Sequence, residues 1–199
     1  MFENIRVDLA RKRNLYHNYS GWFSHYIRNT LDLGTLSVII YRFGHWANQL
    51  KIPIVKHFLL LIYLFAKTFI IVGAGIHIPA RAKIGKGFVI HNFSGIFISD
   101  GTIGQNCTIQ QGVTIGGIRP NIWKGKPRPP RIADNVYIGV GAKILGDVTI
   151  GNNVVIGANS VVITDIPDNC TVMGVPARII SREENRERPY GSPSQEPNV

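Results

Sequence analysis

The sequence has 199 residues, of which 22 are Lys or Arg and 12 are Asp or Glu, so its formal net charge at pH 7 is +10. Hydrophobic residues make up 45% of the chain and charged residues 17%, which excludes a chain that is disordered throughout and fits one domain with an appendage. The basic excess would attract phosphorylated ligands, anionic lipid or nucleic acid, and charge alone does not choose among them. Cys107 and Cys170 are too few for a disulfide framework or a four-ligand zinc site, so we expect a reducing cytoplasm.

The N-terminal part of the chain predicts helices. Residues 1–50 mix basic with aromatic side chains and indicate one or two amphipathic helices. Residues 1–13 are polar where a signal peptide needs an apolar core, so we expect the protein to stay in the cytoplasm. The most apolar stretch, 52–78, predicts a helix with Pro53 in its first turn. Lys56, His57 and Lys67 interrupt it, which favours a helix packed in the protein or lying on a membrane surface over one that spans a bilayer.

From Ile78 onward, aliphatic residues recur every six positions, with one inserted residue after Ile96 and a longer insertion after Ile115. The residues that keep this spacing are Ile78, Ile84, Ile90, Ile96, Ile103, Ile109, Ile115, Ile132, Ile138, Ile144, Ile150, Ile156 and Val162. A period of six fits neither an α-helix nor one antiparallel hairpin, and it is typical of a parallel β-helix whose short strands stack an inward aliphatic in every turn. Residues 118–130, which are rich in Pro and basic side chains, must leave the coil as a loop. Residues 181–199 predict a disordered tail.

Several segments of this repeat resemble the hexapeptide-repeat acyltransferases, most closely the branch of serine O-acetyltransferases and related polysaccharide acetyltransferases. The segments that carry the resemblance are 75–87, 93–99, 111–117 (GlnGlyValThrIleGlyGly), 141–147, 156–162 and 174–178 (GlyValProAlaArg). The resemblance implies a mainly β fold, with a left-handed parallel β-helix of hexapeptide repeats over residues 73–180. An N-terminal α-helical segment at 1–72 would precede it, and the extended loop would interrupt it. Because coils stack only on their neighbours, we expect the β-helix to fold without residues 1–70.

The resemblance also implies a homotrimer that binds acetyl-CoA in the cleft between neighbouring subunits and uses no metal. A general base would take the proton of the acceptor hydroxyl as its oxygen attacks the thioester, and backbone amides would receive the oxyanion. The family's cofactor-lining positions fall on Gly117, Val140, Ala158 and Arg178. Small residues at these positions are also what tight coils require. In the loop, Lys124 and Lys126 are expected to meet the phosphates of the cofactor, although they would also serve as a solubilising cluster.

The sequence departs from the family at the catalytic positions. The histidine that acts as the base falls on Asn92, the acid before it on His91, the acid one coil earlier on His77, and a second histidine on Pro129. Asparagine cannot act as a base at neutral pH. Either His91 is the base, or His77 is the base and Asn92 orients it across adjacent coils. The third possibility is a relative that is inactive or serves a different purpose.

Three functions follow from these residues. The first is an O-acetyltransferase that acts on a sugar or glycan intermediate at the inner face of the membrane, because the basic, aromatic and apolar N-terminal segment would lie near lipid. The second is serine acetylation, against which stands the short segment before the repeat. The third is a non-catalytic trimeric scaffold. A nucleic-acid partner fits the charge but no motif, so we expect none.

Overall fold

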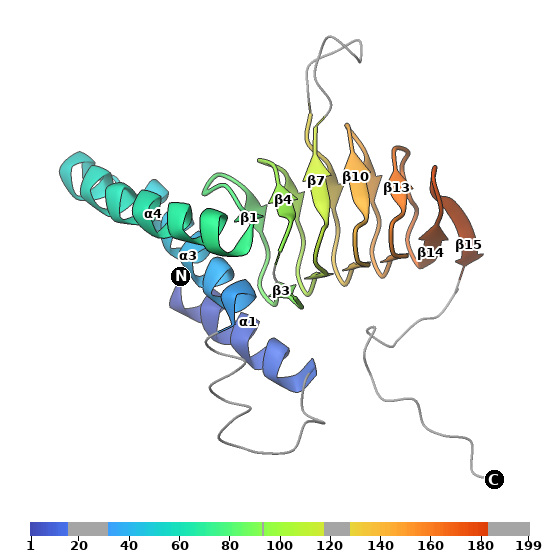
Figure 1. Cartoon of the computed structure of the whole chain (residues 1–199), viewed down its shortest axis with the longest axis horizontal. Coiled ribbons are helices and arrows are strands. Elements are labelled where there is room, and N and C mark those ends of the chain that lie inside the picture. The colour runs from blue at the N-terminus through green and yellow to red at the C-terminus, as the bar shows by residue number, and fades with distance from the viewer. Residues whose placement is uncertain (16–31, 93, 118–127, 183–199) are drawn as a thin grey trace.

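The computed structural model describes residues 1–15, 32–92, 94–117 and 128–182. The helices are α1 (Phe2–Leu15), α3 (Leu33–Gln49) and α4 (Pro53–Ala74). The strands are β1 (Ile76–His77), β2 (Lys83–Ile84), β3 (Val89–Ile90), β4 (Ile96–Ile98), β5 (Thr102–Ile103), β6 (Thr108–Ile109), β7 (Thr114–Gly116), β8 (Arg131–Ile132), β9 (Tyr137–Ile138), β10 (Lys143–Leu145), β11 (Thr149–Ile150), β12 (Val155–Ile156), β13 (Val161–Val162), β14 (Cys170–Met173) and β15 (Arg178–Arg182). Figure 1 shows the helices gathered at one end of a row of stacked strands.

The strands form a coil with three sides. Every third strand pairs with its neighbour, so the sheets have the orders β1-β4-β7-β10-β13, β11-β8-β5-β2 and β15-β14-β12-β9-β6-β3. All pairs among the described strands are parallel except β14 with β15. This is the three-sided parallel β-helix that the six-residue period predicts. Its left-handed sense stays a prediction.

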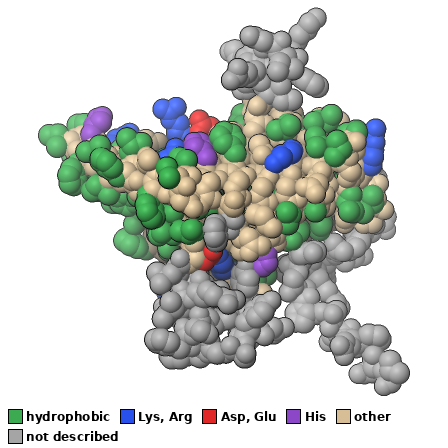
Figure 2. Space-filling view, in the orientation of Figure 1, with side chains coloured by type: hydrophobic (Ala, Val, Ile, Leu, Met, Phe, Trp, Pro, Cys, Tyr) green, Lys and Arg blue, Asp and Glu red, His purple; other side chains and the backbone are tan. Residues whose placement is uncertain are grey.

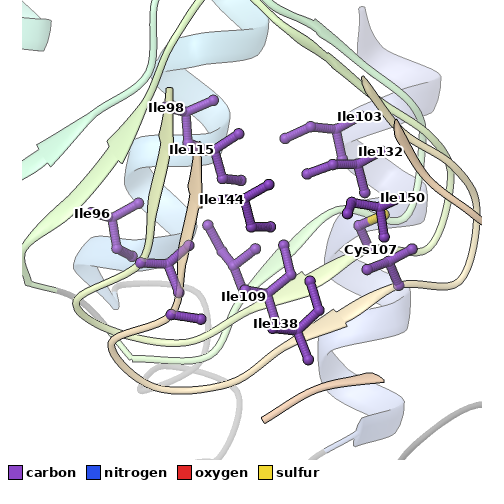
Figure 3. Close-up of a cluster of buried hydrophobic side chains, with 14 of the residues drawn as sticks. Ile96, Ile98, Ile103, Cys107, Ile109, Ile115, Ile132, Ile138, Ile144 and Ile150 are labelled. Carbon is purple, nitrogen blue, oxygen red and sulfur yellow. The ribbon is translucent and has the colours of Figure 1, made fainter. Parts of the chain in front are cut away.

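The predicted inward aliphatics fill the centre of the coil. All thirteen residues that keep the six-residue spacing are buried, and in Figure 3 the labelled isoleucines point from different strands toward one another. Removing these side chains from water is the main favourable term for the coil. Cys107 and Cys170 are buried and free, and burial raises the pKa of the Cys107 thiol to about 12. Cys107 therefore packs in the core and is not a thiolate nucleophile at neutral pH.

The insertion in the repeat lies earlier than the pattern indicates. Ile98 pairs with Ile115 in the sheet, so Ile98 and not Ile96 stacks in the regular position. Ile90 and Ile98 are therefore eight positions apart, whereas Ile109 and Ile115 are six apart at the next turn of the coil. Both Ile96 and Ile98 are buried, which is why the pattern did not separate them. The two extra residues lie in the corner between β3 and β4.

The corners of the coil require backbone that glycine and asparagine tolerate. Asn106, Asn135, Asn153 and Asn169 lie at equivalent corners with φ between 55° and 59°. Their side-chain amides form a ladder with donor–acceptor distances of 2.9 to 3.2 Å. Asparagine is one of the few non-glycine residues that adopts this left-handed conformation readily. Because the asparagines stack from coil to coil, each side-chain amide donates a hydrogen bond to the side-chain oxygen of the next.

The helices α1 and α3 dock on the first coil through buried polar contacts. Arg42 of α3 pairs with Asp8 of α1 at 2.9 Å and donates to the backbone oxygens of Ile84 and Gly85. Asp8 also accepts from the backbone N–H of Phe88. Val38 and Tyr41 belong to the same buried cluster as the aliphatics of the coil. The expectation that the β-helix folds without residues 1–70 stays a prediction. These contacts weigh against it, because removing the helices would leave backbone groups unpaired and expose the end of the core.

The described residues also decide two further predictions. The helix predicted within 52–78 is confirmed as α4, which has Pro53 in its first turn and ends where Gly75 adopts φ 62°. The predicted tail begins too early, because residues 181–182 belong to β15, which pairs with β14. The rest of the predicted tail, and residues 118–127 of the predicted loop, lie outside the described residues.

Candidate functional site

The extended corner between β3 and β4 carries His91 and Asn92. The backbone N–H of His91 donates to Ile109 at 2.9 Å, which continues the ladder of β3 for one residue before the chain turns. Ser94 and Gly95 in this corner both have positive φ. The two extra residues thus shape the corner that carries the candidate base.

The helices α1 and α3 lie against β3, the strand that leads into His91. Lys12 of α1 donates to Asp32, to Thr35 at 2.7 Å and to the backbone oxygen of Ile90 at 3.1 Å. The imidazole of His91 is half-buried, and burial followed by the nearby Lys12 charge lowers its pKa, while Asp32 acts in the opposite direction. A lowered pKa keeps the ring neutral at neutral pH, which is the form that accepts a proton.

Asn92 begins a line of residues along one edge of the coil. Its amide donates to the side-chain oxygen of Gln111 at 3.1 Å. Gln111 lies beside Val140 and Val140 beside Ala158, because Gly141 donates to the Gln111 backbone oxygen and Asn159 to that of Val140. Val140 and Ala158 are exposed. The predicted base region and two predicted cofactor positions therefore share one edge.

His77 lies on a different part of the surface, at the end of β1. Its ring stacks on that of Phe97 in β4, with centroids 4.9 Å apart and planes 13° apart. Its Nδ1 atom is buried and has no hydrogen-bond partner among the described residues. Burial and then the Lys67 charge lower the pKa of His77, and Asp100 opposes this more weakly. His77 is thus neutral at neutral pH, like His91.

The structure does not show Asn92 orienting His77. The amide nitrogen of Asn92 donates to Gln111, and the buried ring nitrogen of His77 lacks a partner in the described part of the chain. Of the two alternatives for the base, the geometry therefore favours His91, which directly precedes Asn92 at the start of the edge that carries Val140 and Ala158.

The other predicted cofactor positions are spread along the coil. Arg178 begins β15 and is exposed. It pairs in register with Met173 of β14, at the end of the coil opposite the helices. Gly117 lies at another corner, directly after β7. Lys124 and Lys126 lie outside the described residues. At the base of the loop, Arg131 pairs with Asp147 at 3.1 Å, which partly neutralises it.

Sequence reasoning missed the residues that surround the two histidines. Lys12, Asp32 and Gln111 at the extended corner, and Phe97 and Lys67 around His77, come from other helices or coils. Among these, only Asp32 carries a local signal, as the N-cap of α3 with its carboxylate accepting from the Thr35 N–H at 3.1 Å. That signal indicates a helix start and not a site.

Comparison with known proteins agrees with this architecture. The model of the family "Bacterial transferase hexapeptide (six repeats)" matches residues 129–164. A serine acetyltransferase from Synechococcus elongatus is 40% identical over 168 residues, which are 81% of this chain and 65% of that protein. The crystal structure of serine acetyltransferase from Neisseria gonorrhoeae has a TM-score of 0.73 at 28% identity, over 91% of this chain and 65% of that one. A serine acetyltransferase in complex with CoA has a TM-score of 0.71 at 30% identity, over 89% and 68% of the two chains.

Proposed function

We propose that this chain, which belongs to the family of hexapeptide-repeat acyltransferases, transfers an acetyl group from acetyl-CoA to the hydroxyl group of an acceptor. The chain spans 65% of the length of the Synechococcus relative, so the activity of that relative is a proposal for this chain. The observation that carries the proposal is the shared edge, on which Asn92 lies in line with Gln111, Val140 and Ala158, and His91 directly precedes Asn92. A solved relative in complex with CoA supports the choice of donor.

In the proposed reaction His91 takes the proton of the acceptor hydroxyl. As the proton leaves, the acceptor oxygen forms a bond with the acetyl carbonyl carbon, and the carbon–sulfur bond of the thioester then breaks. The proton passes from His91 to the departing thiolate of coenzyme A, which restores the neutral imidazole. Holding donor and acceptor on one edge supplies much of the rate by proximity.

We propose a homotrimer as the active form. Gly117 lies at the corner after β7, whereas Val140 and Ala158 lie at the corners after β9 and β12. A ligand that touches both sets must cross one face of a single coil or lie between two copies. The family resemblance favours the second arrangement, in which the cleft between subunits completes the site.

We propose serine as the first acceptor to test. The relatives are named serine acetyltransferases, and this supports the alternative interpretation of the sequence over the sugar or glycan acceptor that we expected first.

One observation keeps a sugar or other neutral hydroxyl compound as the second candidate. The pKa of His91 responds more to Lys12 than to Asp32, and that of His77 more to Lys67 than to Asp100. The potential at both rings is therefore biased toward positive charge. A neutral hydroxyl compound has no ammonium group for this potential to repel, whereas serine has both an ammonium group, which it repels, and a carboxylate, which it attracts.

The test is the release of free coenzyme A from acetyl-CoA, followed with a thiol reagent over a panel of L-serine, other amino acids, sugars and nucleotide sugars. Acceptor-dependent release supports the transferase, and the preferred acceptor decides between the two candidates. A folded protein that binds acetyl-CoA but releases no coenzyme A with any acceptor would favour a scaffold.

Replacing Arg178 with alanine is expected to weaken acetyl-CoA binding by about three- to tenfold, because one exposed charge-assisted contact to a phosphate is lost. Calorimetry at two salt concentrations measures the effect, which should shrink at high salt. Arg81→Ala is the matched control, since Arg81 is equally exposed but lies on the first coil. Equal affinity of the two variants would remove Arg178 from the cofactor site.

A further inference from the structure

The solvent-facing side of α4 is the most apolar surface of the described chain. Large hydrophobic side chains are exposed along its whole length, from Ile54 (82%) through Phe58 (64%), Phe65 (70%) and Phe69 (66%) to Val72 (82%). At about 100° per residue these five fall within an arc of about 60°. They are the apolar stripe of α4. Figure 2 shows hydrophobic side chains gathered over this helix.

The opposite side of α4 holds the helix to the protein. Tyr63, Ile70 and Ala74 are its buried residues. The Tyr63 hydroxyl donates to the backbone oxygen of Ile78 at 3.2 Å, and the Tyr63 ring occupies the space where a side chain at Gly44 of α3 would lie. The apolar stripe therefore points away from the body, and Figure 1 shows the Pro53 end of α4 extending beyond the coil.

Such a surface is unusual for a protein surrounded by water. Only 17% of the most apolar window of α4 is buried in the protein, and the helix is long and apolar enough to cross a membrane. Soluble proteins rarely expose contiguous apolar patches of more than a few hundred Å², and larger ones mark binding surfaces. The stripe thus needs a partner that accepts Phe, Ile and Val along about five turns of helix.

The charges around α4 indicate the chemistry of that partner. Residues 1–76 contain nine Lys or Arg and three Asp or Glu. Two of the acids, Asp8 and Asp32, are paired internally with Arg42 and Lys12. Lys51, two residues before α4, is exposed, and Lys56 and Lys67 are half-buried on the side of α4 opposite the stripe. An interfacial helix directs its charges to this side, toward the head groups and water. This excess of positive charge complements the phosphates of anionic lipids.

We propose that α4 lies in the surface of an anionic lipid membrane, with its apolar stripe among the acyl chains and the body of the protein on the aqueous side. A two-fold contact of this face with the same face of a second copy fits less well, because it would bring two surfaces of the same positive charge together. A bilayer-spanning position conflicts with the fold, because the middle of α4 is bonded to Ile78 and packed against α3. Long lysine side chains can reach the head groups while their stems lie along apolar surface.

The test is sedimentation of the full chain with vesicles of phosphatidylcholine alone or mixed with phosphatidylglycerol. We expect binding to the mixed vesicles that weakens as salt is raised. The double variant Phe58→Gln, Phe65→Gln should lower the partition coefficient at least about tenfold, because two aromatic side chains no longer enter the lipid. Ile163→Gln, Ile180→Gln is the matched control, since both residues are exposed on the far end of the coil. Circular dichroism should show all three proteins equally folded.

Each alternative gives a different result. Equal vesicle binding by the double variant and its control would overturn the proposal. A smaller oligomer for the double variant in light scattering, without any vesicle binding by the parent, would identify a second copy as the partner. A parent protein that stays with membranes in alkaline carbonate would indicate a spanning helix. Coenzyme A release measured without lipid is independent of these outcomes, so failure of this inference leaves the proposed reaction untouched.

Discussion

Replacing His91 with alanine is expected to lower kcat for acetyl transfer by about a hundredfold or more, while the Kd for acetyl-CoA stays within about twofold. A general base contributes about 10² to 10⁴ in rate and acts on the transition state, not on cofactor binding. The measurement is steady-state coenzyme A release with the acceptor that the panel identifies, together with calorimetry for acetyl-CoA.

Two matched variants make this result specific. His77→Ala should lower turnover less, because His77 stacks on Phe97 away from the edge that carries Val140 and Ala158. Asn92→His restores the histidine of the family at that corner and should not lower turnover. If His77→Ala abolishes turnover and His91→Ala does not, the base is His77. If neither substitution has an effect, the catalytic assignment is wrong even where the reaction is right.

The pH profile provides a second readout of the same residue. Burial and the Lys12 charge lower the pKa of His91 from its ordinary value of about 6.5. A base must be neutral, so kcat/KM should fall as the pH drops through the lowered pKa, and the midpoint of this acid limb should lie below the ordinary pKa of histidine. Lys12→Met removes one of the causes of the shift and should move the acid limb to higher pH. If the acid limb of the pH profile has the same midpoint in this variant, His91 is not the titrating group.

The coil could be predicted because its signal is local and repeated. Each inward aliphatic lies six residues from the next, so the pattern survives in a single sequence, and all thirteen positions are buried. The exact place of the insertion was not predictable, because Ile96 and Ile98 are both inward and only pairing with Ile115 distinguishes them. That ambiguity falls on the corner that carries the candidate base.

The surroundings of the site could not be predicted for a different reason. His91 lies near Lys12, which is 79 positions earlier, and Lys12 is held there by Asp32 and the Ile90 backbone oxygen. No periodicity links such residues. The apolar run of α4 was visible in the sequence, but its burial was not, because a core helix and a surface helix have the same composition.

The buried pair of Asp8 and Arg42 gives the largest expected effect on stability. Asp8→Ala should lower the free energy of unfolding by about 3 to 5 kcal/mol, because it leaves the Arg42 guanidinium buried without its counter-charge and the Phe88 N–H without its acceptor. Urea denaturation at several protein concentrations measures the change. Asp147→Ala is the control, since its pairs with Arg128 and Arg131 are exposed and worth about 0 to 1 kcal/mol.

The same substitution tests whether the helical segment supports the site. Asp8 and Lys12 are four residues apart on α1 and therefore lie on one face of that helix, so loosening Asp8 should also release Lys12 from the Ile90 backbone oxygen beside His91. Replacing both partners, Asp8→Leu with Arg42→Met, should recover much of the stability by removing the unpaired charge. If turnover recovers with it, the pair acts by docking the helices on the first coil. If Asp8→Ala unfolds no more readily than Asp147→Ala, the helices are held by apolar packing of Val38 and Tyr41 instead.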